Sequence, residues 1–429
     1  MNFVDNDSRP SSASSQSPIV SSAPTTPDDG VQEAIANVQR AAQADKTKTG
    51  QTHADFLEAV RQLNLVAEAP QETLMRIRFE VQMHSSPIHI PLQVAAIRLT
   101  LEIGALDALV SQDGEKITAQ ELAEITGYNA LMIERVMRLV TWCGVCDEAG
   151  TATYVANPTT RLIVAPGGAG GLKHIYDLSF PIASKLMDYL HETKIHQFPT
   201  PPQKTAFEHT FGQNLWDHMA DNPKLRKSFD DYMAARRNGI QSWYETYPIA
   251  TELFPDTRAD SVMLVDIGGN LGHEAASFHA ARPDHPGRVI LQDLESMIQT
   301  VKDNGTSEGV EPMAYNFFEE QPVKGARAYY LRSVLHDWDD PSSEKILSNT
   351  AKAMEPEYSR LLIDEYVLPD MKAPIRGSSL DFLMMMLCGG IERTKSQWES
   401  LLGRCGLEIV KIWGGRSDYE QVIEAKLKK

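Results

Sequence analysis

The sequence predicts an α/β fold: a Rossmann-like sheet of seven strands, preceded by a mainly helical N-terminal domain. The first observation behind this prediction is an alternation of apolar, strand-like runs with helical stretches, the order expected of a doubly wound sheet. The runs lie at residues 261–267, 288–294, 311–318, 326–335 and 359–368. The second observation is a pair of later runs, 408–415 and 418–427, with no helix between them. Such a pair should form an antiparallel hairpin at the end of a mainly parallel sheet.

The first strand runs into a glycine-rich turn, VDIGGNLG at residues 265–272. Gly268, Gly269 and Gly272 lack a Cβ, so the backbone can approach a ligand closely there. The spacing is not GxGxxG, which argues against a clamp for a dinucleotide pyrophosphate and favours a cofactor that carries adenosine without a phosphate. The second strand ends in Asp293, about 20 residues further on, the spacing at which an acid reaches the ribose hydroxyls of such a cofactor.

The fourth strand ends in LRSVLHDWDD, residues 331–340, which contains His336. The ordinary pKa of histidine, about 6.5, allows it to accept a proton near neutral pH, so His336 is a candidate general base. A core histidine bonded to a backbone carbonyl is the alternative interpretation. The distance of His336 from the glycine turn favours catalysis.

With these motifs the chain resembles the class I S-adenosylmethionine-dependent O-methyltransferases of the plant caffeate type, especially their fungal secondary-metabolism relatives. The resemblance covers about residues 85 to 427 and is most specific in VDIGGNLG, LQDL, YNFFEEQPVKGARAYYLRSVLHDWDD, LLIDEYVLP and ERTKSQW. It implies S-adenosylmethionine as the cofactor and His336 as the catalytic base, flanked by Glu365 and Glu392. A carboxylate on the far ring nitrogen would fix the imidazole tautomer and stabilise the imidazolium, a task suited to either glutamate. Because the histidine activates the hydroxyl, no metal is expected.

The resemblance also implies a set of cofactor contacts, from Gly268, Asp293, Asn316, Phe317, Arg332 and Trp338. Gly268 would lie near the methionine moiety, Asp293 would bind the ribose hydroxyls, and two aromatic residues, Phe317 and Trp338, would pack on the adenine.

Three positions differ from the residues usual in the family. Arg332 stands where the family usually has a lysine. Asn316 stands where many members have an aspartate that accepts from the adenine amino group, and its carbonyl can still accept, though less strongly. Asn270 replaces a common glycine, and asparagine tolerates a positive φ better than most residues do. We expect cofactor binding to survive these changes.

Residues 117–157 predict two helices around Gly127 followed by a short hairpin, with a capping box formed by Thr118 and Glu121. This is a winged-helix pattern, so a DNA-binding regulator is a second hypothesis. The net charge of −17 argues against it, because binding to phosphates needs a basic face. In the family that the chain resembles, the same domain serves dimerisation, so we expect a homodimer and no nucleic-acid partner.

Helical stretches rich in aromatic residues and methionine, at 171–190, 207–237 and 378–390, should wall an apolar substrate cavity. Most such residues are ordinary core. The candidates for the pocket lining are His174, Phe211, Trp216, Met233, Asp337 and Met385. His174 would orient a substrate carbonyl or hydroxyl, or else be a satisfied structural histidine.

The expected divisions of the 429-residue chain are a disordered tail at 1–30, a helical and winged-helix dimerisation domain at 31–165, a substrate-pocket and linker region at 166–255 and a cofactor-binding methyltransferase domain at 256–429. The Ser- and Pro-rich tail has neither the basic start nor the apolar core of a secretory signal, and the chain has no apolar run of membrane-spanning length. We therefore expect a cytoplasmic protein without a membrane partner. The four cysteines fit a reducing compartment, and the CxxC of Cys143 and Cys146 lacks a second pair at zinc spacing.

The motifs leave one rival function within the enzyme class. Some fungal proteins that resemble this family keep the cofactor yet catalyse dehydration or pericyclic ring closure, and in these the base histidine is often replaced. The presence of His336 with both glutamates favours methyl transfer to a hydroxyl of a small aromatic or polyketide-type secondary metabolite. A cofactor-dependent cyclase of the same fold is the alternative.

Overall fold

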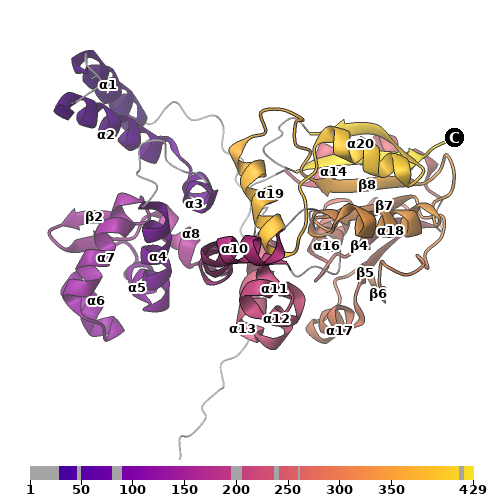
Figure 1. Ribbon diagram of the computed structural model, residues 1–429, viewed down its shortest axis with the longest axis horizontal. Helices are drawn as coiled ribbons and strands as arrows, with labels where there is room; N and C mark the ends of the chain where they lie inside the picture. The colour runs from indigo at the N-terminus through magenta and orange to yellow at the C-terminus, as the bar shows by residue number, and fades with distance from the viewer. Residues whose placement is uncertain are drawn as a thin grey trace, which may run out of the picture. The chain divides into compact units, whose positions relative to one another are not determined.

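The computed structural model of the chain describes residues 29–45, 50–79, 89–194, 205–235, 241–258, 261–414 and 420–429 (Figure 1). The predicted tail lies almost wholly outside these residues. The chain divides into two compact units, Met1–Ala69 and Pro70–Lys429. In the first unit, helices α1 (Asp29–Ala44) and α2 (Gly50–Ala67) pack against each other. The second unit contains the sheet and every residue predicted for the site.

The seven-stranded sheet that the sequence predicts is present in the second unit, in the order β6-β5-β4-β7-β8-β10-β9 (Figure 1). Its strands are β4 (Val262–Ile267), β5 (Arg288–Asp293), β6 (Val310–Ala314), β7 (Ala328–Arg332), β8 (Arg360–Glu365), β9 (Leu407–Trp413) and β10 (Gln421–Leu427). Strands β4 to β8 pair in parallel. The predicted antiparallel hairpin is formed by β9 and β10, and β10 also pairs antiparallel with β8.

Strand β6 is shorter than the run predicted at 311–318, because it ends at Ala314. The side-chain oxygen of Asn316 accepts the N–H of Phe318 at 3.1 Å, and this local bond turns the backbone away from the ladder. The aromatic residues after Ala314 favour a strand by composition, but they belong to the turn.

Each face of the sheet is covered by helices, and successive residues of a strand point to opposite faces. Val265 and Tyr329 pack in one core with Trp398, whereas Leu264 and Tyr330 pack in another with other helices. Helices α18 (Asp340–Ala351) and α20 (Lys395–Arg404) cover the first face, and α14 (Trp243–Thr246), α16 (His273–Ala281) and α17 (Glu295–Asn304) cover the second. The carboxyl ends of β4, β5, β7 and β8 therefore meet at one edge of the sheet, where ligands bind in folds of this kind.

The two helices and hairpin predicted at 117–157 are present. A three-stranded sheet, β1 (Ile117–Thr118), β2 (Asp147–Gly150) and β3 (Thr153–Val155), stands beside α6 (Ala119–Thr126) and α7 (Ala130–Trp142). The predicted capping box between Thr118 and Glu121 begins α6, and Gly127 ends it with a φ of 77°. Helices α3 (Pro70–Phe79), α4 (His89–Glu102), α5 (Ala105–Ser111) and α8 (Pro158–Val164) complete this region.

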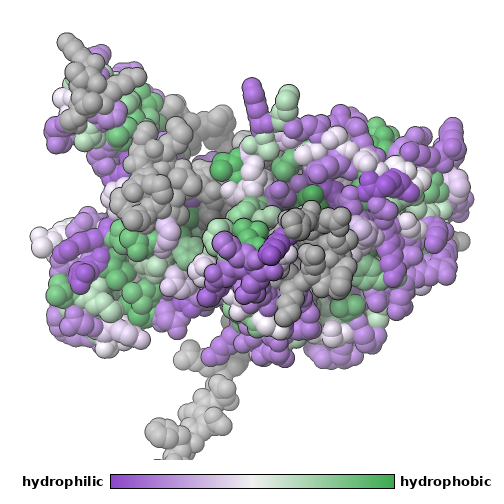
Figure 2. Space-filling view, viewed as in Figure 1, coloured by the Kyte–Doolittle hydropathy of each residue, from purple (hydrophilic) through white to green (hydrophobic). Residues whose placement is uncertain are grey.

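A helical layer links this region to the sheet. It comprises α9 (Pro166–Lys173), the π-helical turn η1 (His174–Ser179), α10 (Phe180–Thr193), α11 (Ala206–Phe211), α12 (Leu215–Asp221), α13 (Pro223–Ala235) and α19 (Ile375–Leu387), with α15 (Ile249–Glu252) and the turn η2 (Phe254–Asp256) leading into β4. Methionines of α19 pack in one cluster with residues of α10, α11 and α12. Figure 2 shows apolar surface near α10 and α19, where Met187, Leu190, Ile375 and Phe382 are exposed.

Candidate active site

The glycine turn after β4 is shaped by three residues with positive φ: Gly268 at 71°, Asn270 at 52° and Gly272 at 79°. The value at Asn270 confirms that asparagine adopts the conformation for which the family commonly uses glycine. A Cβ on Gly268 would lie 3.0 Å from a methyl carbon of Val334 and 3.8 Å from the ring of Phe317. The backbone of Gly268 is therefore packed against residues that follow β6 and β7, so four segments meet at the turn.

Asp293, at the end of β5, bonds to this turn. Its carboxylate accepts the backbone N–H of Asn270 at 2.8 Å and that of Leu294 at 2.8 Å. Burial raises the pKa of the Asp293 carboxyl, and the two backbone bonds oppose that rise. The acid that the spacing singled out therefore lies beside the glycine turn, and its contact with a ribose remains a prediction.

Asp266 is a functional candidate that the sequence reasoning missed. Its side chain is 2% exposed, and one carboxyl oxygen, Oδ2, has no hydrogen-bond partner among the described residues. Burial is the main cause that raises the pKa of Asp266 to about 7. The signal was present, because Asp266 is the acidic residue of VDIGG, two positions before the first glycine.

Arg332 supplies the opposite charge at the end of β7. Its Nη1 lies 2.6 Å from Oε1 of Glu274, in the first turn of α16. Its Nε and Nη2 have no hydrogen-bond partner within the described part of the chain, and Nε lies 3.9 Å from the carboxylate of Asp364. Buried donors and acceptors in this condition suit a ligand that completes them. Arg332 and Asp266 together fit the carboxylate and ammonium groups of an amino-acid moiety such as that of S-adenosylmethionine.

Aromatic rings lie beyond the turn. The rings of Phe317 and Trp338 are 5.9 Å apart at 80°, and those of Phe318 and Trp338 are 4.8 Å apart at 87°. Edge-to-face packing of this kind fixes the position of an apolar wall. The side-chain oxygen of Asn316 already accepts the N–H of Phe318, so in this structure it is engaged within the turn.

His336 lies in a short 3₁₀ turn, η3 (Leu335–Asp337), directly after β7, and is 6% exposed. Its Nδ1 is 2.5 Å from Oε1 of Glu392, and its Nε2 is 3.6 Å from Oδ1 of Asp337. The sequence left open which glutamate reaches the imidazole. Glu392 is the one in hydrogen-bond contact with the ring.

Glu365, at the end of β8, holds the turn instead of the ring. Its Oε1 accepts the backbone N–H groups of Val334 at 3.0 Å and Leu335 at 2.7 Å. Burial is the main cause that raises the pKa of the Glu365 carboxyl to about 7. Glu365 therefore acts on His336 through the main chain that carries it.

Arg393 holds the same turn from the other side, and the sequence reasoning missed it. It is fully buried, and its guanidinium donates to the carbonyl of Leu335 at 2.9 Å and to that of Trp338 at 2.9 Å. It also bonds to Ser343 at 3.0 Å and Asp340 at 3.0 Å. The signal in the sequence was its place next to Glu392 in the ERT motif.

The segment that carries Glu392 is pressed against His336. The N–H of Ile391 donates to the carbonyl of His336 at 2.8 Å, and a Cβ on Gly390 would overlap that carbonyl. Only glycine permits this approach. The His336 turn and the segment that follows α19 are therefore locked together by backbone contacts.

The predicted pocket residues lie on the helical layer. His174 begins the π-helical turn η1, a feature found often at functional sites, and its ring lies 5.5 Å from Phe229 and 6.3 Å from Tyr232. Trp216 packs edge-on to Phe229 at 6.3 Å. Phe211 and Met385 lie at the edge of the cluster formed by α10, α11, α12 and α19. Met233 lies on α13 and Asp337 in the turn of His336; their contact with a substrate remains a prediction.

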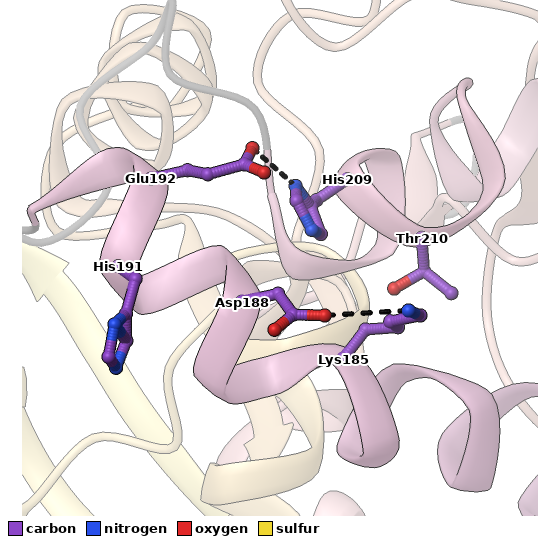
Figure 3. Close-up of a pocket in the computed structure, with 6 residues that line it drawn as sticks. All are labelled: Lys185, Asp188, His191, Glu192, His209 and Thr210. Carbon is purple, nitrogen blue, oxygen red and sulfur yellow. Dashed lines mark hydrogen bonds and ion pairs between the residues drawn. The ribbon is translucent and has the colours of Figure 1, made fainter.

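Two hollows lie near these elements. One of about 420 Å³ is formed on α10 and α11 by Lys185, Asp188, His191, Glu192, His209 and Thr210 (Figure 3). Its charges pair with one another: His209 lies 3.4 Å from Glu192 and Lys185 lies 3.4 Å from Asp188, so it offers little to a ligand. The other, of about 320 Å³, includes Glu392 and Asp381 in its wall. It lies next to the glutamate that supports His336.

Two general findings bound the chemistry. Within the described ranges, no three His, Cys, Asp or Glu side chains are grouped as a metal site would require. In the same ranges, the helices are too short or too polar to cross a membrane.

The fold and this arrangement define a family. A family model described as an O-methyltransferase domain matches residues 185–408, just over half of the chain. Demethylsterigmatocystin 6-O-methyltransferase of Aspergillus parasiticus is 36% identical over 323 residues, which cover 75% of this chain and 82% of that protein. The chain belongs to the class I S-adenosylmethionine-dependent O-methyltransferases, and it is an enzyme of that class with S-adenosylmethionine as its cofactor.

Solved structures share this fold across nearly the whole chain. OxaC in complex with sinefungin and meleagrin superposes with a TM-score of 0.72 at 30% identity, covering 93% of this chain and 99% of OxaC. LepI in complex with S-adenosylmethionine superposes with a TM-score of 0.75 at 28% identity, covering 92% of this chain and 100% of LepI. A further structure, with a TM-score of 0.74 at 28% identity, is described as a pericyclic reaction enzyme and covers 92% of this chain and 100% of its own.

Proposed function

We propose that this enzyme transfers a methyl group to a hydroxyl of a small aromatic or polyketide-type secondary metabolite, with His336 as the base for that hydroxyl. The observation that carries the proposal is the contact between His336 Nδ1 and Glu392 Oε1 at 2.5 Å. A carboxylate at Nδ1 directs Nε2 toward the acceptor and stabilises the positive charge that the ring acquires. General-base catalysis contributes typically about 10²- to 10⁴-fold to the rate.

The same proposal assigns the cofactor contacts. Arg332 and Asp266 would hold the methionine moiety through their unsatisfied groups, Asp293 the ribose, and the aromatic residues Phe317 and Trp338 the adenine. The bound cofactor supplies an electrophilic methyl group. The chain positions the acceptor oxygen against it, and such positioning contributes more to the rate than proton removal alone.

A cyclase that uses the cofactor without consuming its methyl group is the second candidate. The similarity to a structure described as a pericyclic reaction enzyme favours it. Against it stands the His336–Glu392 pair, because a ring closure does not require an oxygen nucleophile to lose a proton.

The acceptor side and the assembly complete the proposal. His174, Phe211, Trp216, Met233, Asp337 and Met385 would line the acceptor pocket. The three-stranded sheet with α6 and α7 is interpreted as a winged helix that serves a homodimer in the cytoplasm. The exposed apolar side chains of α10 and α19 support a partner subunit in this interpretation.

The test follows the methyl group. Purified enzyme is incubated with S-adenosylmethionine labelled in the methyl group and with an extract of the native host, and the labelled product is isolated. We expect S-adenosylhomocysteine to form in a one-to-one ratio with product, and sinefungin, which cannot give up a methyl group, to abolish product formation. Turnover with sinefungin, without release of S-adenosylhomocysteine, would identify the cyclase instead.

A further inference from the structure

Both ring nitrogens of His336 face a carboxylate. Nδ1 lies 2.5 Å from Glu392 Oε1, and Nε2 lies 3.6 Å from Asp337 Oδ1. A neutral imidazole carries a single N–H, so one nitrogen would turn a lone pair toward a carboxylate. The imidazolium carries a proton on each nitrogen and is attracted to both partners. The geometry therefore favours the charged ring.

The charges on the surrounding elements point the same way. Glu365 at the end of β8 and Glu392 after α19 approach the turn of His336, in which Asp337 itself lies. The guanidinium of Arg393 opposes them. The thiol of Cys388, at the end of α19, lies 3.7 Å from Asp337 Oδ1.

A further carboxylate lies behind this group, because Asp381 accepts the N–H of Glu392 at 2.8 Å. Carboxylates thus outnumber the guanidinium around the imidazole. Burial alone would lower the pKa of His336, but Glu392, Asp337 and Glu365 outweigh burial and raise that pKa to about 10.

We propose that His336 already carries both ring protons when the acceptor arrives, and that the acceptor is therefore an acidic phenol or enol that binds as its anion. The inference rests on the methyl transfer proposed above and narrows the class of acceptor. It concerns when His336 is protonated: before the acceptor binds and by water, not by the acceptor inside the site.

The reaction then balances without a proton transfer in the site. The acceptor loses its proton to water, and its oxyanion accepts a hydrogen bond from Nε2–H of His336. The oxyanion forms an O–C bond to the methyl group as the C–S bond breaks, and the electron pair of that bond stays on sulfur. The charges of oxyanion and sulfonium cancel, and His336 keeps both protons for the next turnover.

This scheme selects among hydroxyl groups. A phenol as weakly acidic as tyrosine, with a pKa of about 10, is less than about 1% ionised near neutral pH. An aliphatic alcohol is ionised far less. Enols conjugated to a carbonyl and phenols that carry electron-withdrawing groups are ionised at neutral pH, and these are the acceptors that the site favours.

The protonation state of His336 is measured by nitrogen NMR of histidine-labelled enzyme, without cofactor and loaded with S-adenosylhomocysteine, between pH 6 and 10. His336→Gln assigns the signal among the 12 histidines. We expect both ring nitrogens to remain protonated beyond pH 8, and Asp337→Asn to move the titration of His336 to lower pH by about one unit or more. Glu344→Gln, which removes an exposed acid that pairs with Arg404, should leave it unmoved.

A neutral His336 at pH 7.5 in both forms of the wild-type enzyme would overturn the inference, whatever Asp337→Asn does. The acceptor gives a second, independent answer. Once the methylated hydroxyl has been identified, its pKa should lie about two units or more below the phenol value of about 10; an alcohol or an ordinary phenol contradicts the inference and leaves methyl transfer intact. If no methyl group is transferred, the proposed function fails, while the NMR titration still decides the state of His336.

Discussion

The edge of the sheet and the helical layer hold their functional residues in different ways. At the sheet edge, backbone groups are bound by charged side chains: Glu365 and Arg393 hold the turn of His336, and Asp293 holds the glycine turn. In the helical layer, Phe211 and Met385 are held by apolar packing alone. Hydrogen bonds to the main chain fix a position closely, whereas apolar packing tolerates exchange of similar volumes. The catalytic half of the site is therefore rigid in construction, and the acceptor half is open to substitution.

The largest effect is expected at the base. His336→Gln should lower turnover by about 10²-fold or more while the dissociation constant for S-adenosylmethionine changes only a few-fold, because the ring acts on the acceptor. Calorimetry and a turnover assay measure the two quantities. His191→Gln, on the exposed side of α10, is the matched control. An equal loss of binding and turnover would mean that His336 is structural.

Arg393 comes next. Arg393→Lys keeps the charge but cannot hold the carbonyls of Leu335 and Trp338 together, and a shift of the base by about 1 Å costs on the order of 10²-fold in turnover. Cofactor affinity should be retained. Arg404→Lys is the control, since Arg404 bonds to the same Asp340 from the surface. Full activity in Arg393→Lys would show that the turn of His336 holds itself.

Asp293→Ala tests the cofactor half of the sheet edge. The loss of a hydrogen bond to a charged group should weaken cofactor binding by about 1.5 to 3 kcal/mol. Calorimetry measures it, and helical content by circular dichroism should not change. The exposed Asp303 on α17 provides the control Asp303→Ala. Unchanged affinity would place the ribose elsewhere.

The His336–Glu392 pair should make stability depend on pH. The pKa of His336 is raised in the folded protein to about 10 from the usual value of about 6.5. A raised folded pKa adds stability that is complete below about pH 6.5 and disappears as pH rises toward 10. The melting temperature of Glu392→Gln should therefore fall furthest below that of wild type near pH 6, and the gap should narrow toward pH 10. A gap that widens with pH would contradict the charged pair.

The smallest effect is expected in the helical layer. Phe211→Leu should raise the KM for the acceptor several-fold, the scale of about 1 kcal/mol of lost apolar contact, and should leave cofactor affinity unchanged. Steady-state kinetics with the identified acceptor measure it. A change in turnover as large as that of His336→Gln would remove the distinction between the two halves of the site.

Much of the fold could be predicted because its signals are local. The capping box of Thr118 and the strand that ends in Asp293 each depend on a few neighbouring residues. The choice between Glu365 and Glu392 could not be made, because it depends on where β8 and the segment after α19 meet the turn of His336. Arg393 was missed for a related reason: it bonds to main-chain carbonyls of residues 335 and 338, more than 50 positions away, and carbonyls leave no mark in a sequence.

The order of the last two strands affects how the sheet is completed during synthesis. Strand β10 lies between β8 and β9, although it is the last of the three to leave the ribosome. Until Gln421–Leu427 emerges, β8 has an open edge and β9 has no neighbour to join. An exposed edge of this kind invites pairing with other chains. Cells that produce the enzyme therefore depend on its final strand to close the sheet, and a chain that stops before β10 should aggregate.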